Sequence, residues 1–314
     1  MVPRKAGTDW EILAPAKLNL YLEVLGKRPD GFHDLETLMV PVQLFDQVRW
    51  SPPASADATN ADECSLSVES FALDQRSPCL DSLATSDNLV LRAARLLAER
   101  IGRRSSGHFH LIKRIPLQAG LGGGSSDAAA TLRLANACWQ GGLGEDELAE
   151  LAAELGSDVP FFLKSGPAIC RGRGERVSMI TGLPKMHFVL VKPVCGLSTA
   201  EVFQKLAFWR EQETITEGQS TDKLGKLLEA LRMGAMQSAC QWMINRLEFG
   251  AARLASEILR IKALLAAAGC WGQLLTGSGS TVFGLARTAR HARGVARQLA
   301  AKRIGSVMVT ATGW

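Results

Sequence analysis

The most constraining feature of the chain is a glycine-rich stretch, "IPLQAGLGGGSSDAAATL", which runs from Ile115 to Leu132. Glycine occupies positions 120, 122, 123 and 124, and two serines and an aspartate follow directly. Glycine loses more conformational freedom on folding than any other residue, so such a density is costly to order. A chain that keeps these glycines needs bare backbone at this place.

The flanking sequence places this stretch between a strand and a helix. "HFHLIKRI" (108–115) predicts a strand, and Ala128, Leu132, Ala135 and Trp139 repeat at helical spacing. Backbone N–H groups at a helix N-terminus are unpaired and favour an anion. The stretch is no Walker A loop, because no Lys follows the glycines, and it does not fit G-x-G-x-x-G. A simple turn would explain one or two glycines, whereas four followed by Ser-Ser-Asp favour a phosphate-binding loop.

Patterns on both sides of this loop indicate an α+β protein. Apolar and polar residues alternate from Lys17 to Val24, which predicts a half-buried strand, and a Pro-Asp-Gly turn leads from it into a second strand. Beyond residue 185 the predicted order is strand, helices, two strands, helix, strand, which is typical of a ferredoxin-like sandwich. We therefore expect two domains, an N-terminal α/β domain at 1–180 and a C-terminal ferredoxin-like domain at 181–314.

Composition excludes several classes of protein. A hydrophobic fraction of 46% and a charged fraction of 21% are typical of soluble globular chains. The net charge of +5 is mild and the basic clusters are short, which argues against nucleic acid as a partner. The seven cysteines are scattered without a C-x-x-C pair, which favours free thiols. No segment resembles a signal peptide or a membrane span. We expect a cytoplasmic monomer or homodimer that binds an anionic small molecule.

The glycine-rich stretch resembles the phosphate loop of the GHMP kinases, the superfamily of galactokinase, homoserine, mevalonate and phosphomevalonate kinases. Two more motifs of this superfamily are present in the right order, "APAKLNLYLEVLGKRPDGFHDLET" before the loop and "LLTGSGSTVFGL" after it. "SDNLVLRAARLL", "GSDVPFF" and "INRLE" are similar to the branch that phosphorylates 4-diphosphocytidyl-2-C-methyl-D-erythritol. The resemblance covers most of the chain but not 51–63 and 205–235. It implies a two-domain GHMP kinase fold.

The activity that the resemblance implies is transfer of the ATP γ-phosphoryl group, with Mg²⁺, to the substrate 2-hydroxyl in non-mevalonate isoprenoid biosynthesis. Two alternatives remain open from the sequence. One is a GHMP kinase for homoserine or a mevalonate derivative, but "PDGFH" suits a substrate that carries a base. The other is an inactive nucleotide-binding homologue, but the expected catalytic residues and the loop serines are all present.

The resemblance implies two catalytic residues. Asp158 in "GSDVPFF" would take the proton of the attacking hydroxyl, and Lys17 would keep that carboxylate ionised and stabilise the charge on the moving group. From the residues alone, Asp158 is equally well a helix N-cap and Lys17 is more simply a surface lysine. The family motif decides for the catalytic roles.

The resemblance also implies an ATP site. Asn88, which follows a Ser86/Asp87 cap candidate, and Lys113 would lie near adenine, although Asn88 also suits a helix cap. Ser126 and Asp127 are candidates for the Mg²⁺ side, and the sequence identifies no metal ligand. The loop residues assigned to ATP are Pro116, Gly120, Gly122, Gly123, Gly124, Ser125 and Ser126.

The substrate site is implied mainly by aromatic residues. Phe32, a Tyr in many family members, and Phe203 would sandwich the cytosine, and His33 would contact its polar edge. Phe203 also suits core packing, and Thr199, a further candidate contact, also suits a position beside a helix cap. Asn19 shares the polar face of the first strand with Lys17 and can line the same pocket. The backbone of "TGSGS" (276–280) would approach the reacting groups.

Overall fold

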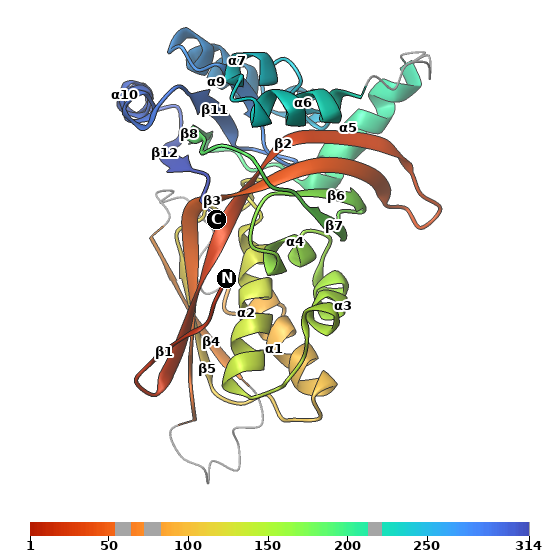
Figure 1. The fold of residues 1–314 in the computed structure, drawn as a ribbon, viewed down its shortest axis with the longest axis vertical. Coiled ribbons are helices and arrows are strands. Elements are labelled where there is room, and N and C mark those ends of the chain that lie inside the picture. The colour runs from red at the N-terminus through yellow and green to blue at the C-terminus, as the bar shows by residue number, and fades with distance from the viewer. Residues whose placement is uncertain (54–63, 72–82, 213–221, 314) are drawn as a thin grey trace.

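A long antiparallel hairpin is the central element of the structure (Figure 1). Its strands are β2 (Asp9–Lys27) and β3 (His33–Ser51). The Arg28 N–H donates a hydrogen bond to the Phe32 carbonyl across the turn (2.8 Å), and Gly31 there has a φ of 86°, which favours glycine. The hairpin predicted from the alternating residues is confirmed.

The structure is a computed structural model that describes residues 1–53, 64–71, 83–212 and 222–313. Most of the loop predicted at 51–63 and the middle of the stretch 205–235 lie outside the described residues. Within them, no helix is both long and apolar enough to cross a membrane. The cysteines of the described residues are free thiols, as expected, and Cys79 lies outside them.

The first sheet is built around the hairpin and has the strand order β1-β2-β3-β5-β4. Strands β6 and β7 extend it from the other half of β3, and β9 pairs in parallel with β2. Four helices pack on the face of this sheet around one hydrophobic core (Figure 1). The strands are β1 (Arg4–Ala6), β4 (Ser65–Ser70), β5 (His108–Lys113), β6 (Ala168–Gly172), β7 (Arg176–Met179) and β9 (Ile244–Asn245). The helices are α1 (Leu89–Arg100), α2 (Gly123–Cys138), α3 (Glu145–Leu155) and α4 (Val159–Leu163).

The second sheet is antiparallel and has the order β10-β11-β8-β12. With helices between β8 and β10 and again between β11 and β12, this is the β-α-β-β-α-β arrangement of a ferredoxin-like fold, as predicted. The strands are β8 (His187–Lys192), β10 (Gly272–Leu275), β11 (Val282–Ala286) and β12 (Ser306–Ala311). The helices are α5 (Thr199–Gln212), α6 (Lys223–Arg232), α7 (Met236–Ala239), α8 (Glu248–Leu254), α9 (Glu257–Ala267) and α10 (Ala289–Ala300).

The middle of β2 is buried on both faces, which differs from the half-buried strand that its alternation predicts. Leu18 and Leu20 pack into a core shared with the second sheet. The polar residues Lys17 and Asn19 are only 3% and 2% exposed. They are covered because the glycine-rich loop and the hairpin 276–280 both hydrogen-bond to this stretch of β2. A polar face buried by two loops is where a site can form.

The two sheets are joined by the connection from β7 to β8, at residues 180–186. β9, which comes from the C-terminal part of the chain, adds to the first sheet beside β2, and Thr312 forms an isolated bridge with Val42 of β3. The two parts are therefore joined through the long hairpin. A division into domains near residue 180 stays a prediction.

Candidate active site

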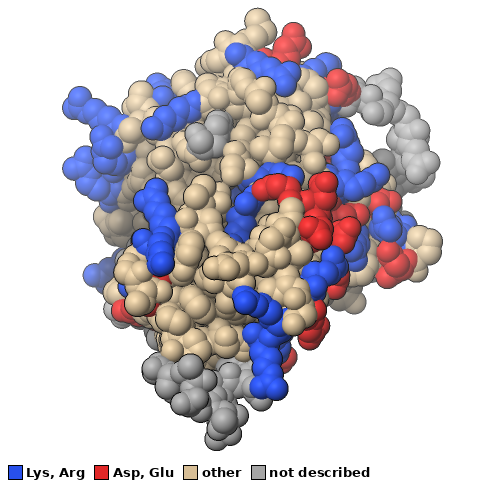
Figure 2. All heavy atoms as spheres, turned by 60° about the horizontal axis from the view of Figure 1, so that its bottom comes forward, with Lys and Arg blue, Asp and Glu red and all other residues tan. Residues whose placement is uncertain are grey.

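A cavity of about 1080 Å³ lies over the buried polar face of β2. Its walls come from β2, β3, the glycine-rich loop, the start of α4, the turn between β6 and β7, the start of α5 and the hairpin 276–280. It therefore collects residues from most of the length of the chain. On the face shown in Figure 2, Lys and Arg side chains form separate groups rather than one basic stripe, and the Asp and Glu side chains lie mainly on the right side of the view.

Lys17 and Asp158 meet in this cavity. Lys17 Nζ lies 3.5 Å from Asp158 Oδ2 and donates a hydrogen bond to Asn19 Oδ1 (2.6 Å). The Lys17 side chain is 4% exposed, whereas that of Asp158 is 36% exposed. The Lys17 ammonium group is thus buried and held by Asn19, while the Asp158 carboxylate is accessible to a bound molecule.

Asn19 is fixed by further hydrogen bonds. Its Nδ2 donates to Thr37 Oγ1 (2.8 Å), whose hydroxyl in turn donates to the Tyr21 carbonyl (2.6 Å). The Asn19 N–H donates to Thr276 Oγ1 (3.2 Å), which ties β2 to the hairpin 276–280. Because each partner is buried, the orientation of Asn19 and therefore of the Lys17 ammonium group is set before any ligand binds.

Asp158 stands at the N-cap position of α4, but its side chain accepts no capping hydrogen bond. Pro160 follows within the first turn of this helix, where it removes an N–H that a cap would otherwise serve. From the residues alone, Asp158 could be a helix N-cap or a catalytic base. In the structure its side chain does not cap the helix. It faces the cavity and Lys17 instead.

The glycine-rich loop has two kinds of glycine. Gly120 and Gly122 both have a φ of 72°, and a Cβ would lie 2.1 Å from the Thr276 carbonyl oxygen at Gly120 and 2.8 Å from the Phe162 ring at Gly122. Both are needed by the packing of the loop itself. Gly124, in the first turn of α2, would place a Cβ only 3.5 Å from Leu89, an ordinary contact. Its bare backbone is not explained by packing.

A second, smaller cavity of about 190 Å³ lies beside Gly124. Its walls are mostly leucine side chains, with Asn88, Lys113 and Asp127 as the polar groups. Asn88 is the N-cap of α1, in place of the Ser86/Asp87 candidate: its Oδ1 accepts from the Val90 N–H (2.9 Å) and its Nδ2 donates to the Leu83 carbonyl (2.7 Å). Two residues expected at the ATP site, Asn88 and Lys113, therefore share one pocket.

Lys113 is part of a buried ion cluster under this pocket. Its Nζ contacts Asp46 Oδ2 and lies 2.6 Å from Asp127 Oδ2, and all three side chains are almost fully buried. Burial lowers the pKa of Lys113, but the two carboxylates outweigh this effect and raise it. Burial raises the pKa of Asp127 to about 7. Lys113 acts to lower this pKa, but the negative charge of Asp46 acts to raise it. The cluster joins β3, β5 and α2.

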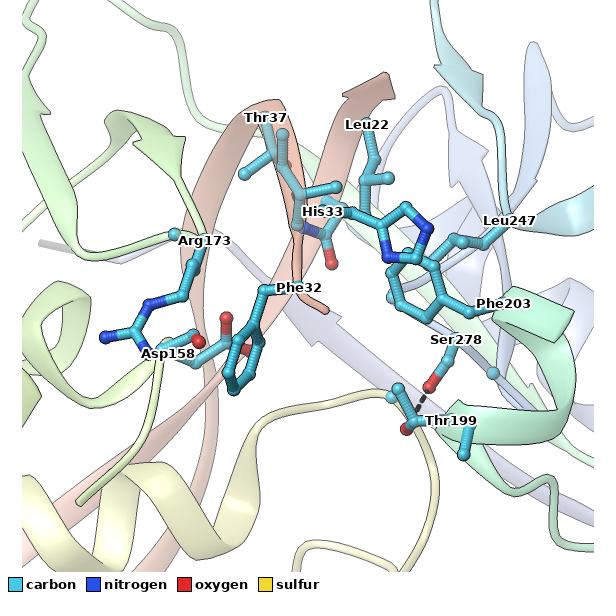
Figure 3. Close-up of a pocket in the computed structure, with 18 of the residues that line it drawn as sticks. Leu22, Phe32, His33, Thr37, Asp158, Arg173, Thr199, Phe203, Leu247 and Ser278 are labelled. Carbon is cyan, nitrogen blue, oxygen red and sulfur yellow. Dashed lines mark hydrogen bonds between the residues drawn. The ribbon is translucent and has the colours of Figure 1, made fainter. Parts of the chain in front are cut away.

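His33 and Phe203 lie across the large cavity from Asp158, and Phe32 lies between them in the view of Figure 3. The rings of His33 and Phe203 are stacked, with centroids 4.6 Å apart and planes at 23°. Phe32 is 50% exposed, and the Arg173 guanidinium lies over its ring at 4.9 Å. Thr199 Oγ1 and Ser278 Oγ are 2.8 Å apart, which links α5 to the hairpin 276–280.

The structure brings most of the predicted site residues to these two cavities. Those that line the large cavity are Lys17, Asn19, Phe32, His33, Gly120, Gly122, Asp158, Thr199 and Phe203. Those that line the small one are Asn88, Lys113 and Gly124. The predicted residues that line neither are Pro116, Gly123, Ser125 and Ser126.

Sequence reasoning missed several residues of the large cavity. Arg173 and Thr37 lie in it, as do Gln118 and Ser157 next to predicted residues. Only the "RGRGER" run at 171–176, with its glycines on both sides of Arg173, offered a signal, and it was interpreted as a short basic cluster. Thr37 has no signal in the sequence because its role is to orient Asn19 across two strands.

Comparison with known proteins shows which family the chain resembles. The family model "GHMP kinases N terminal domain" matches residues 88–166, and "GHMP kinases C terminal" matches residues 225–304. A 4-diphosphocytidyl-2-C-methyl-D-erythritol kinase of Pelotomaculum thermopropionicum is 41% identical over 286 residues, which cover 90% of this chain and 91% of that protein. One from Pseudarthrobacter chlorophenolicus is 35% identical over 98% of this chain and 93% of its own.

A solved structure shows the same similarity in three dimensions. The crystal structure of a 4-(cytidine 5′-diphospho)-2C-methyl-D-erythritol kinase superposes with a TM-score of 0.74 at 34% identity, covering 97% of this chain and all of that one (100%). The expected GHMP kinase fold is confirmed. The chain belongs to the 4-diphosphocytidyl-2-C-methyl-D-erythritol kinases, a family of ATP-dependent small-molecule kinases within the GHMP superfamily.

Proposed function

We propose that this chain transfers the γ-phosphoryl group of ATP to the 2-hydroxyl of 4-diphosphocytidyl-2-C-methyl-D-erythritol, a step of non-mevalonate isoprenoid biosynthesis. One observation carries the proposal: a single cavity is lined by the Lys17–Asp158 pair and, across from Asp158, by the stacked rings of His33 and Phe203, with Phe32 between them. A substrate that joins a flat base to a polyol by a diphosphate has the same order of groups. The relatives named above support this substrate over homoserine or a mevalonate derivative.

ATP would lie along the glycine-rich loop. The leucine-lined small cavity beside Asn88 suits an adenine ring, and Gly124 at its edge leads to the N-terminus of α2. Gly120 and Gly122 line the large cavity, so the loop connects the two. The unpaired N–H groups at the start of α2 would bind the polyphosphate and direct its terminal group toward Asp158.

The reaction needs one proton acceptor and one cation. The substrate hydroxyl would donate its proton to the Asp158 carboxylate while its oxygen bonds to the γ-phosphorus, and the bond from that phosphorus to the ADP oxygen breaks. Lys17, held by Asn19, would stabilise the negative charge on the attacking oxygen and the transferred group.

We propose Mg²⁺ as the ion that accompanies ATP. Magnesium in such sites is held by one or two protein oxygens together with phosphates and water. Among the described residues no three His, Cys, Asp or Glu side chains gather as a metal cluster. Ser126 Oγ, in the first turn of α2, is buried with no hydrogen-bond partner, so this oxygen fits a ligand at the phosphate end. The ion would neutralise phosphate charge.

The base would bind between Phe32 and Phe203. The exposed ring of Phe32 offers a stacking surface, but one face of Phe203 is covered by His33. Cytosine would take the place of His33 on that face, and His33 would turn toward the polar edge of the base. The imidazole can donate and accept there, as recognition of cytosine requires.

A substrate panel tests the proposal. We expect ATP-dependent phosphorylation of the cytidyl substrate and none of homoserine or mevalonate at equal concentration. Phosphorylation of mevalonate or homoserine alone would show a different GHMP kinase, and ATP binding without turnover on any of them would show an inactive homologue. The cytoplasmic location and the oligomeric state, monomer or homodimer, stay predictions.

A further inference from the structure

Arg173 is a charged residue of the large cavity that the reaction scheme does not use. It lies in the turn between β6 and β7, where Gly172 and Gly174 have φ values of 73° and 123°. Within this turn the Arg173 N–H donates a hydrogen bond to Glu175 Oε2 (2.7 Å). The turn therefore fixes the Arg173 backbone at the cavity wall.

The guanidinium group of Arg173 rests on an aromatic ring and not on a carboxylate. Its central carbon lies 4.9 Å from the centroid of Phe32 (Figure 3). A guanidinium group stacked in this way keeps its in-plane N–H donors free for an anion. In the part of the chain that the structure describes, Arg173 forms no ion pair, whereas Arg171, two residues away, pairs with Glu36 at 2.9 Å. The carboxylate that feels its charge is Asp30, whose pKa is lowered by the Phe32 N–H and by Arg28 and, after these, by Arg173.

The same turn also contacts the reaction end of the cavity. A Cβ at Gly174 would lie 3.2 Å from the Ser157 carbonyl oxygen and 3.6 Å from Asp158 Oδ1. Arg173 is thus adjacent to Phe32 on one side, and its turn is adjacent to Asp158 on the other. A substrate that stacks its base on Phe32 and presents a hydroxyl to Asp158 must pass its middle part along this wall.

We propose that Arg173 binds the diphosphate group of the substrate while its guanidinium remains stacked on Phe32. This inference rests on the proposed function, because only a nucleotide-linked polyol has an anionic group at that position. The other two cations of the cavity are less suited to the task. Lys17 is engaged by Asn19 and Asp158, and Lys27 is exposed at the end of β2. Arg173 would then distinguish a cytidine diphosphate ester from an uncharged cytidine compound.

The test compares cytidine 5′-diphosphate with cytidine by titration calorimetry on the full chain. We expect Arg173→Gln to weaken cytidine diphosphate binding roughly tenfold or more, the loss of a charge-assisted hydrogen bond, and to change cytidine binding by less than about threefold. In turnover assays the KM for the nucleotide-linked substrate should rise while the KM for ATP stays unchanged. Arg173→Lys keeps the charge but loses the planar stack on Phe32. Its affinity for cytidine diphosphate should lie between those of the original protein and Arg173→Gln.

Arg171→Gln is the matched control, because it removes an arginine two residues away, in β6, that does not line the cavity. It should leave both affinities unchanged. An unchanged affinity of Arg173→Gln for cytidine diphosphate would overturn the inference, as would an equal loss for both ligands, since Arg173 would then only support Phe32. If the unmodified chain bound neither ligand, the proposed function itself would fail, a result distinct from the other two.

Discussion

Lys17 Nζ lies 3.5 Å from Asp158 Oδ2, although the two residues belong to β2 and to the start of α4. The lysine is buried and the carboxylate is half-exposed, so only the carboxylate is open to a ligand. Asn19 holds the lysine from the other side. The pair therefore combines a cation held in place with a carboxylate that a substrate hydroxyl can reach, as proton transfer to Asp158 requires.

Asp158→Asn should reduce turnover by a factor of roughly 10²–10⁴ because the amide cannot accept the hydroxyl proton. ATP binding should remain, since the side chain does not line the small cavity. Single-turnover kinetics and ATP titration measure the two effects. Turnover within about threefold of the original would mean that another group takes the proton.

Gly120→Ala and Gly124→Ala should have opposite consequences for stability. At position 120 the new Cβ would lie 2.1 Å from a backbone oxygen, and the residue would have to adopt a φ of 72°. The free energy of unfolding should therefore fall by about 2 kcal/mol or more. At position 124 it would meet only Leu89, and stability should be kept or raised by about 0.5–1 kcal/mol.

The functional effect of Gly124→Ala should be a higher KM for ATP, because the added methyl group intrudes where the loop borders the small cavity. Thermal unfolding and steady-state kinetics of both variants give the comparison. A Gly124→Ala enzyme with an unchanged KM would show that the polyphosphate does not approach this backbone.

Asp127→Asn should change how stability depends on pH. Folding raises the pKa of this buried acid from 3.8 to about 7, so between these values the folded chain binds more protons than the unfolded chain. The stability of the original protein relative to the variant should therefore fall as the pH rises from about 4 to about 7 and stay level above it. Urea unfolding across this range measures the difference; a rise with pH would contradict the assignment.

His33→Phe should keep an aromatic ring that can stack on Phe203 in the free protein but lose the polar contact to the bound base. We expect the preference for cytidine diphosphate over uridine diphosphate to shrink by about tenfold, the contribution of one well-placed hydrogen bond. Phe32→Tyr is the matched control, because it preserves the stacking ring and should preserve the preference. Competition binding with the two diphosphates measures both, and an undiminished preference in His33→Phe would place base recognition elsewhere.

The sequence was sufficient for the fold because its strongest patterns are local. The alternation in β2, the Pro-Asp-Gly turn and the order of elements after residue 185 each depend on neighbouring residues. Strand β9 was missed because it has two residues and forms only by pairing with β2. The burial of Lys17 was also missed, since it depends on two loops distant in sequence.

Within the site, the sequence predicted which residues line the cavities better than it predicted what those residues contact. Asn88 and Lys113 lie together as expected, but both are already engaged by the protein, Asn88 as a cap and Lys113 in an ion cluster. The stacking of His33 on Phe203 could not be predicted from residues on separate elements. Arg173 escaped because a guanidinium group over Phe32 is a tertiary contact.

Strand β2 carries Lys17 and Asn19 and also bears β9, whose Asn245 donates hydrogen bonds to the Leu275 and Gly277 carbonyls (2.8 and 2.7 Å). A wide opening of the two halves about a hinge would have to tear this strand pairing and these bonds apart. We then expect substrate entry and product release to depend on local motions at the rim of the cavity. Candidates are the turn at 28–32 and the hydrogen bond between the Thr199 and Ser278 hydroxyl groups. We therefore expect the two sheets to keep their arrangement through the reaction while the rim of the cavity moves.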